Sequence, residues 1–282
     1  MLPDFFIGGA QKSGTTSLHV LLQQHQEVFI PRRPQEIHFF DREESWARGR
    51  DWYESLFGQW RGEKRVGQTS PLILYQPEAG ERIARLVPQA RFLFILRHPL
   101  DRAYAHYWHE VKKGWESLPF ERALAAEPER LRGGPEARRH YSYLDRGRYA
   151  AQLRRFFERF SRERVLVLRY EELRSDAAGL RVRCAAFLEV DPAGFAPATA
   201  RVHNPSRIPR LRALQVATRG LRERWPRAGR LVDALNLKTA PYPPLDSELR
   251  ARFSRGLEPE LDALERLLGI DLSDWRGAGA RC

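Results

Sequence analysis

The chain is poor in cysteine and in long apolar runs. Its 282 residues include two cysteines, Cys184 and Cys282, which cannot build a disulfide framework or a metal cluster. No run of about 18 apolar residues, the length of a membrane-spanning helix, occurs, and residues 1–7 lack the basic and apolar regions of a signal peptide. These absences predict a protein of a reducing compartment, the cytoplasm, with no stable membrane insertion.

Lysine is also scarce, although the chain is strongly basic. Only five of the 48 basic residues are lysines, and the formal net charge is +12, which suggests an anionic partner such as DNA, a membrane surface or a phosphate-rich small molecule. The arginines are spread evenly, which is more typical of a solvated surface than of a nucleic-acid face. Without a helix-turn-helix, zinc-finger or aromatic RNA-binding signature, a basic nucleic-acid-binding protein is the disfavoured alternative, and we expect no nucleic acid.

Enough apolar residues are present for a large core, since 42% of the chain is hydrophobic. Phe5 to Ile7 form a short apolar run before a glycine-bearing loop, and residues 91–97 and 164–170 are further apolar runs typical of buried strands. A helix is expected from Pro99, because proline suits a first helical position. Strands alternating with helical segments predict a doubly wound α/β fold, a mainly parallel sheet flanked by helices.

The pattern favours a single domain over residues 1–282. Residues 239–246 are rich in proline and are expected to form a rigid linker before a long final helix that ends near Trp275. No internal repeat or low-complexity tract divides the chain.

The segment Gly8-Gly9-Ala10-Gln11-Lys12-Ser13-Gly14-Thr15-Thr16-Ser17 carries the strongest functional signal. A strand that enters a glycine-rich loop and then a helix directs backbone N–H groups and the positive end of the helix at one point. The lysine adds a positive charge, so we expect a phosphate-type group to bind there.

The loop departs from the ATP- and GTP-binding pattern in two ways. A Walker loop places lysine after glycine and before a magnesium-binding hydroxyl, whereas here Lys12 precedes Gly14. The buried strand at 91–96 is followed by Arg97, where such an enzyme usually has a metal-holding aspartate. A nucleotide kinase with the same loop is the alternative within this class, but it would need magnesium.

Both departures agree with another family. The order Gly-x-x-Lys-Ser-Gly-Thr-Thr-Ser-Leu resembles the 5′-phosphosulfate loop of sulfotransferases that use 3′-phosphoadenylyl sulfate (PAPS), which have a fold like that of P-loop nucleoside triphosphate hydrolases. The segment from Ile95 to Ala105 is similar to their 3′-phosphate-binding strand and helix. Arg97 matches the family arginine, whereas Ala105 stands where a serine is usual and predicts weaker binding or a substitute donor.

Further segments continue the resemblance, particularly to carbohydrate and natural-product sulfotransferases. They are Gln35-Glu36-Ile37-His38-Phe39-Phe40-Asp41, Gly67-Gln68-Thr69-Ser70-Pro71, Gly147 with Tyr149, and Asn204 to Arg210. Two of them depart from the family, since Gln35 replaces a lysine and Gln68 replaces an acid.

The resemblance implies transfer of a sulfuryl group from PAPS to an acceptor hydroxyl, with release of adenosine 3′,5′-bisphosphate (PAP). The acceptor could be a sugar, a glycopeptide, a lipid or a small natural product. No metal is required, and the sequence has no ligand cluster with metal spacing. The expected cofactor-binding residues are Lys12, Ser13, Gly14, Thr15, Thr16, Ser17, Arg97, Ala105, Tyr170, Arg207 and Arg210.

These residues differ in their expected roles. Lys12 would stabilise the charge on the sulfuryl and leaving oxygens, and Arg97 would bind the 3′-phosphate or pair with a carboxylate at the sheet edge. Tyr170 would approach the adenine or belong to the core. Arg207 and Arg210 would contact phosphate from a mobile loop over residues 204–210, or belong to an ordinary charged turn.

The catalytic base is expected in the 35–41 segment. Glu36 is the favoured base, because the resemblance places it after the second strand beside the phosphosulfate loop and because a carboxylate in a cleft can be tuned towards a neutral pKa. His38 is its competitor, and without the resemblance Glu36 would be read as a surface carboxylate in a loop. In an extended segment residues 36 and 38 face the same side, so both could reach the acceptor. His38 could instead orient the acceptor or pack against Phe39 and Phe40.

Overall fold

The computed structural model describes residues 1–196 and 206–276. Two compact units make up the chain: one contains Met1–Arg97 and Tyr149–His203, and the other contains His98–Arg148 and Asn204–Cys282. We describe each unit by itself and call them the first and second unit. The single domain over residues 1–282 stays a prediction.

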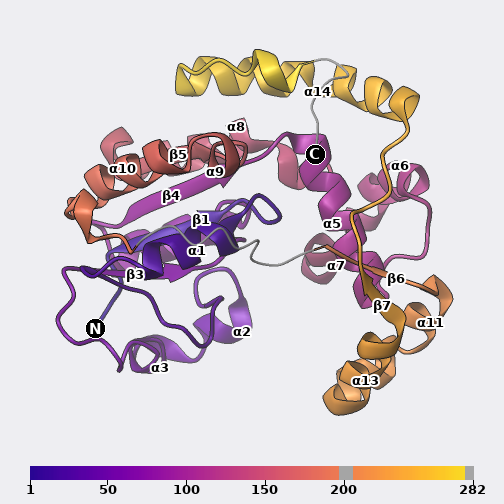
Figure 1. The fold of residues 1–282 in the computed structure, drawn as a ribbon, viewed down its shortest axis with the longest axis horizontal. Helices are drawn as coiled ribbons and strands as arrows, with labels where there is room; N and C mark the ends of the chain where they lie inside the picture. Colours follow the sequence, from indigo (N-terminus) through magenta and orange to yellow (C-terminus); the bar gives the residue numbers. More distant parts are fainter. Residues whose placement is uncertain (197–205, 277–282) are drawn as a thin grey trace. The chain divides into compact units, whose positions relative to one another are not determined.

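A five-stranded sheet forms the centre of the first unit (Figure 1). Its strands are β1 (Phe5–Gly9), β2 (Val28–Phe29), β3 (Arg65–Thr69), β4 (Arg91–Leu96) and β5 (Val165–Arg169). The spatial order is β2-β3-β1-β4-β5, and every neighbouring pair is parallel. This confirms the predicted parallel α/β sheet, including the three strands expected from their apolar runs.

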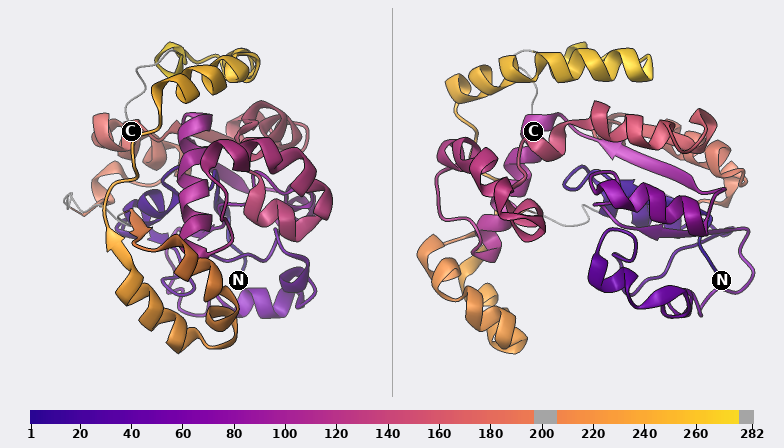
Figure 2. Two further views of the ribbon diagram at one scale, coloured as in Figure 1. Left: turned by 90° about the vertical axis from the view of Figure 1, so that its right-hand side faces the viewer. Right: turned by 180° about the vertical axis from the view of Figure 1, so that it is seen from behind.

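Helices cover both faces of this sheet (Figure 2). Leu93 and Ile95 of β4 pack on one face with buried residues of α1 (Thr15–Gln23) and α10 (Ala177–Leu188). Phe92 and Phe94 point to the opposite face, where their rings lie 4.9 to 5.0 Å from that of Phe156 on α8 (Tyr149–Phe157). The alternation of side chains along the strand thus supplies both layers of the core.

The first unit also contains the helices α2 (Glu43–Trp46), α3 (Gly49–Ser55), α4 (Pro77–Leu86) and α9 (Glu172–Ser175). Between β2 and α2, the chain passes over an aromatic cluster in which Phe39 stacks on Tyr53 of α3 at 4.2 Å between ring centroids. Phe40 contacts the same tyrosine edge-on at 5.1 Å. These contacts fix the segment that carries Glu36 and His38.

The second unit is built around α5 (Pro99–Lys113), which begins at the predicted proline and ends at Gly114 with φ 79°. Around it lie α6 (Phe120–Arg130), α7 (Pro135–Tyr141), α11 (Arg212–Ala217), α12 (Arg219–Arg224), α13 (Pro226–Asn236) and α14 (Ser247–Leu268). β6 (Arg207–Pro209) and β7 (Leu237–Thr239) pair as a short antiparallel two-stranded sheet, with α11 to α13 between them in the chain.

Three boundaries in the second unit differ from the predictions. Within the predicted mobile loop 204–210, Asn204 and Pro205 lie outside the described residues, and 207–209 form strand β6. The linker starts one residue later than expected, because residue 239 ends β7. The final helix stops at Leu268, since Gly269 takes a left-handed conformation, and Trp275 belongs to a separate 3₁₀ turn.

Within residues 1–196 and 206–276, none of the helices combines the length and the apolar character needed to cross a bilayer.

Candidate active site

Functional side chains of the first unit gather where its parallel strands end. The glycine loop follows β1, Ser70 follows β3, Arg97 follows β4 and Tyr170 follows β5. β1 lies between β3 and β4, so successive crossovers leave it in opposite directions. Ligands of open α/β sheets bind at the carboxyl ends of the strands at such a switch point.

The glycine loop is held in a conformation that suits an anion. The N–H of Ala10 donates to the carbonyl of Ile95 at 2.8 Å, which ties the loop to β4. Gly14 has φ 97° and caps α1 without a side-chain hydrogen bond, so the first N–H groups of the helix point out of its end. A Cβ at Gly14 would lie 2.7 Å from Leu173 and 2.9 Å from Tyr170, which explains why glycine is needed.

Ser13 adds a further polar group to the loop. Its side chain is fully buried, and its hydroxyl has no hydrogen-bond partner within the described part of the chain. A buried hydroxyl without a partner costs free energy, which a ligand oxygen could offset. The loop and Ser13 therefore fit a phosphate or phosphosulfate group.

Three of the predicted cofactor residues meet beside this loop. A guanidinium nitrogen of Arg97 donates to the carbonyl of Lys12 at 3.5 Å. The same guanidinium lies 4.8 Å from the ring centroid of Tyr170, a cation–π distance. The hydroxyl of Tyr149 donates to the carbonyl of Arg97 at 2.9 Å. Lys12, Arg97 and Tyr170 are thus neighbours, as a shared nucleotide site requires.

The segment from Glu36 to Asp41 forms a polar network with Ser70, which we call the Glu36 network. Ile37 is anchored by its N–H to the carbonyl of Thr69 at 2.9 Å, and Glu36 and His38 lie together, as the extended segment predicted. His38 Nε2 lies 3.4 Å from Glu36, and His38 Nδ1 lies 2.7 Å from Asp41. The Ser70 hydroxyl donates to the other oxygen of Asp41 at 2.8 Å.

Glu36 and His38 differ in the exposure of their side chains, and this difference assigns them different roles. The Glu36 side chain is 43% exposed, whereas that of His38 is 16% exposed. Burial lowers the pKa of His38, but hydrogen bonds with Asp41 and Glu36 outweigh it and raise the pKa above its usual value. Glu36 is therefore the accessible member, and His38 connects it to the buried Asp41.

A second histidine, His19 on α1, approaches the same region. Its Nδ1 lies 2.9 Å from the hydroxyl of Thr69. Burial lowers the pKa of His19 to about 4, although the charge of Glu36 acts in the opposite direction. His19 is therefore neutral at neutral pH and supports the end of β3 without adding charge.

The other predicted residues of the loop are placed as expected at the start of α1. Ser13 precedes the N-cap glycine, Thr15 is the first helical residue, and Thr16 and Ser17 complete the first turn. These three hydroxyl residues therefore belong to the first turn of α1, and Thr15 is buried.

Ala105, Arg207 and Arg210 belong to the second unit, and their contacts lie within it. Ala105 is buried on α5, and Arg207 donates to the carbonyl of Asp233 at 3.5 Å. Arg210 follows β6, with its N–H bonded to the carbonyl of Asn236 at 2.7 Å. Their assignment to the cofactor stays a prediction.

Arg102 and Trp108 serve the core of the second unit. Arg102 is fully buried and donates to the carbonyl of Tyr143. Trp108 is buried and stacks on Tyr242 with 5.8 Å between ring centroids.

Asp41 and Ser70 lie within segments that carried the family resemblance, but neither they nor His19 were predicted as site residues. Asp41 lies three residues after His38, and Ser70 directly follows a buried strand. The hydrogen bond between Asp41 and Ser70 joins residues 29 positions apart, where the N–H of Ile37 ties the 36–41 segment to the carbonyl of Thr69 at the end of β3.

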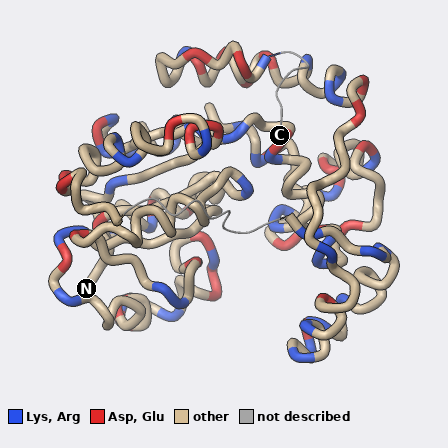
Figure 3. Tube along the Cα trace, viewed as in Figure 1, with Lys and Arg blue, Asp and Glu red and all other residues tan. Residues whose placement is uncertain are grey.

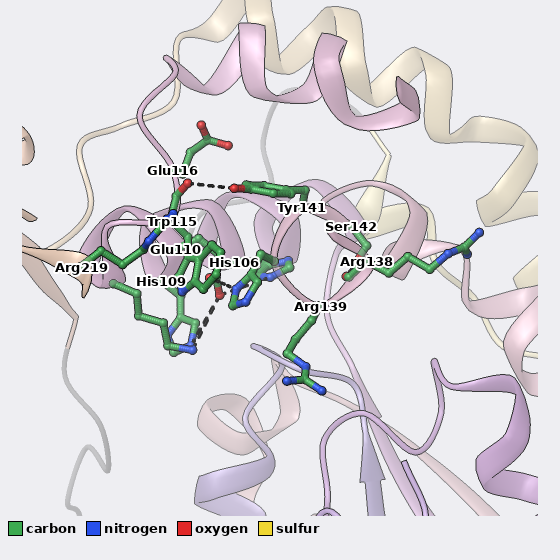
Figure 4. A network of polar contacts seen from close by, with 12 residues as sticks. His106, His109, Glu110, Trp115, Glu116, Arg138, Arg139, Tyr141, Ser142 and Arg219 are labelled. Carbon is green, nitrogen blue, oxygen red and sulfur yellow. Dashed lines mark hydrogen bonds and ion pairs between the residues drawn. The ribbon is translucent and has the colours of Figure 1, made fainter. Parts of the chain in front are cut away.

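The second unit contains a network with similar chemistry around Glu110 (Figure 4). Glu110 Oε2 lies 2.7 Å from His140 Nδ1, and its other oxygen lies 3.7 Å from His106 and 3.8 Å from His109. The Trp115 ring stacks on His140 with 3.7 Å between centroids. The Glu110 side chain is 1% exposed, whereas Lys113 and His109, each 3.8 Å from it, are 45% and 20% exposed. We call this the Glu110 network.

Metal ligands do not gather in either network: no group of three or more His, Cys, Asp or Glu side chains suited to a metal ion occurs in the part of the chain that the structure describes.

The fold and loop define a class, the α/β proteins that bind a phosphate-type group between a central strand and the following helix. Within that class, the sulfotransferase-domain family matches residues 2–208. The chain therefore belongs to the sulfotransferase family. The crystal structure of a sulfotransferase from Alicyclobacillus acidocaldarius is 31% identical, covers 98% of this chain and 100% of its own, and superposes with a TM-score of 0.75.

Two similar proteins are named for heparan sulfate. Human bifunctional heparan sulfate N-deacetylase/N-sulfotransferase 3 is 30% identical over 203 residues, which are 68% of this chain and 23% of that protein. Mouse heparan sulfate glucosamine 3-O-sulfotransferase 5 is 29% identical over 171 residues, 59% of this chain and 47% of that protein. The chain thus spans less than half the length of either relative.

Proposed function

We propose that this protein transfers a sulfuryl group from PAPS to a hydroxyl of a carbohydrate acceptor and releases PAP. The observation that carries the proposal is the placement of an anion-binding loop and an accessible carboxylate at neighbouring strand ends. The N–H of Ser70, next to the Glu36 network, donates to the carbonyl of Ile7 in β1 at 3.0 Å. Membership of the sulfotransferase family supports the reaction type.

The residues around the loop fit PAPS. The open end of α1 and the buried Ser13 hydroxyl suit its 5′-phosphosulfate, and Arg97 with Tyr170 offers a cation and a ring for the 3′-phosphate and adenine. When bound, PAPS supplies the sulfuryl group, and PAP is the leaving group. Lys12 is the cation for the negative charge that develops on the departing oxygen.

Glu36 is the proposed base, because it is the more exposed of the two candidates. Its carboxylate takes the proton of the acceptor hydroxyl as the oxygen attacks sulfur. His38 positions Glu36 through Nε2, and Asp41 fixes the ring of His38 by accepting from Nδ1. Ser70 in turn orients Asp41, so the order from the acceptor inwards is Glu36, His38, Asp41 and Ser70.

The carbohydrate acceptor is proposed because both relatives are named for heparan sulfate, and the 3-O-sulfotransferase of the two supports a hydroxyl as the accepting group. A sugar hydroxyl is favoured over a glycopeptide, a lipid or a small phenol. A cytoplasmic location is also part of the proposal, supported by the low cysteine content.

Ligand-dependent thermal stability tests the proposed cofactor. PAP added with a chelator should raise the melting temperature, and ADP with magnesium should not. The Arg97→Ala variant should lose most of the shift with PAP, whereas Arg85→Ala, which removes an exposed arginine on α4, should keep it. Stabilisation by ADP and magnesium alone would contradict the proposal and favour a nucleotide kinase.

Transfer of labelled sulfate tests the acceptor. The full chain should label a chemically desulfated heparan-type polysaccharide when given PAPS. Labelling of a small phenol but of no polysaccharide would overturn the carbohydrate assignment while leaving the cofactor assignment intact.

A further inference from the structure

Exposed apolar side chains are concentrated in one region of the second unit. Of the ten large hydrophobic residues that are exposed in the described parts of the chain, seven lie between Leu211 and Leu235. Trp225 is 60% exposed, Leu231 64% and Leu235 71%. Single exposed apolar residues are normal on a protein surface, whereas such a concentration marks an interaction site.

On α13 (Pro226–Asn236), Leu231 and Leu235 lie opposite the face by which the helix is anchored. Asn236 is buried and exchanges two hydrogen bonds of 2.9 Å with the backbone of Leu211. Gly229 is buried against Arg222. Leu231 and Leu235, four residues apart, form a separate stripe directed away from this anchor. A helix with apolar residues on both sides requires a second apolar neighbour.

The same region is strongly basic. Residues 207–236 contain eight arginines and only two acidic residues, Glu223 and Asp233. Asp233 lies 3.4 Å from Arg222, and Glu223 lies 4.0 Å from Arg219, so both acids already face an arginine. Figure 3 shows more basic than acidic positions along α11 to α13.

Three further arginines lie beside the exposed tryptophan. Arg224, Arg227 and Arg230 line a hollow of about 740 Å³ together with Leu221 and Trp225. They make no ion pair with any residue that the structure describes. We call the surface formed by these five residues with Leu231 and Leu235 the α12–α13 surface.

The positive charge and the exposed apolar area of the α12–α13 surface together indicate what kind of partner it binds. A second copy bound symmetrically would bring like-charged arginines together, because a two-fold contact uses the same patch twice. A dissolved polyanion would pair with the arginines but leave the tryptophan and leucines in water. An anionic bilayer satisfies both, since its phosphates bind arginine and its headgroup boundary accepts Trp and Leu side chains.

We propose that the α12–α13 surface docks the protein on the surface of an anionic membrane. Trp225, Leu231 and Leu235 enter the boundary between headgroups and acyl chains, and Arg224, Arg227 and Arg230 bind lipid phosphates. The attachment is peripheral and reversible, and it does not depend on the proposed sulfuryl transfer.

Vesicle cosedimentation with the full chain tests the proposal. The protein should bind vesicles of phosphatidylcholine mixed with phosphatidylglycerol, remain free with phosphatidylcholine alone, and dissociate as salt rises. Combined Arg224→Gln, Arg227→Gln and Arg230→Gln substitutions should weaken binding about a hundredfold. Trp60→Ser, which changes a 39% exposed tryptophan of the first unit, is the matched control and should leave binding unchanged.

Substitution of the apolar residues provides a second, independent variant. Combined Trp225→Ser, Leu231→Ser and Leu235→Ser changes should weaken vesicle binding at least tenfold, with an unchanged melting temperature because all three side chains are exposed. If this variant did not fold, the arginine variant and the salt titration would still decide.

Three outcomes would overturn the proposal. They are equal binding to neutral and anionic vesicles, no binding to either, and a concentration-dependent dimer of the unmodified chain that the serine variant abolishes. The last outcome would identify the surface as a contact between two copies.

Discussion

The Glu36 network and the Glu110 network contain the same kinds of side chain, yet they differ in access. Each joins a glutamate to a histidine ring, at 3.4 Å between Glu36 and His38 and at 2.7 Å between Glu110 and His140. In the first, the Glu36 side chain is 43% exposed, and in the second, the Glu110 side chain is 1% exposed.

This difference in exposure shows that a histidine next to a carboxylate is not by itself evidence of a reactive site. A general base must reach the proton it removes, and only Glu36 combines access with a neighbouring anion-binding loop. The Glu110 network instead joins α5 to α7, and Arg219 of α12 lies 4.4 Å above the Trp115 ring. We therefore assign it a structural role.

The largest expected effect comes from removing the base. Glu36→Gln should lower turnover about a thousandfold, because a general base contributes on the order of 10² to 10⁴ in rate. PAP affinity measured by calorimetry should stay close to that of the unmodified chain. Glu78→Gln, which changes an exposed glutamate in the first turn of α4, is the control and should keep full turnover. Full turnover by Glu36→Gln with loss in His38→Ala would instead make His38 the base.

Removal of the loop cation should have a somewhat smaller effect. Lys12→Ala should lower turnover by about 10² to 10³, the effect of losing one group that stabilises transition-state charge. Steady-state kinetics with saturating PAPS would measure it. Lys64→Ala removes an exposed lysine elsewhere in the first unit and should change little. Equal losses in both variants would show a general charge effect rather than a role in the loop.

A substitution in the Glu110 network should lower the stability of the protein and leave its turnover unchanged. Glu110→Gln should lower the free energy of unfolding by about 2 kcal/mol, because the histidines around a buried carboxylate lose their charged partner. Urea unfolding would measure this loss, and turnover of the folded fraction should remain normal. A loss of turnover without any loss of stability would break the comparison and give this network a functional role.

The smallest effect is expected from changing Asp41, which contacts the proposed base only through His38. Asp41→Asn should lower turnover about tenfold, because Asp41 positions Glu36 only through His38. The pKa of His38 should fall, since the hydrogen bond with Asp41 raises it in the folded protein. A histidine with a raised pKa adds stability that is complete below its unfolded pKa, near 6.5, and is lost as pH rises through the folded value.

Nuclear magnetic resonance titration of His38 would follow this change directly. In Asp41→Asn the stabilising window should end at a lower pH than in the unmodified chain. Asp51→Asn, on exposed α3, is the control. An unchanged His38 titration would separate Asp41 from the Glu36 network.

β1, β4 and β5 were predictable because each lies in a continuous apolar run, whereas β2 has only two residues and β3 contains Arg, Gly, Gln and Thr, so neither was predicted. The glycine loop was also predictable, since its signal is local. The hydrogen bond between Ser70 and Asp41 was not predictable, because it depends on a tertiary contact between segments 29 residues apart. The pairing of β6 with β7 was missed because the strands have three residues each, lie far apart in the sequence and carry Arg and Lys on the exposed side.

The most direct test of the account compares three proteins in one assay. Sulfate transfer from labelled PAPS to a desulfated polysaccharide would be measured for the unmodified chain, Glu36→Gln and Glu110→Gln, each corrected for its folded fraction. We predict normal labelling by the unmodified chain and Glu110→Gln and almost none by Glu36→Gln. Normal labelling by Glu36→Gln together with loss in Glu110→Gln would contradict the account.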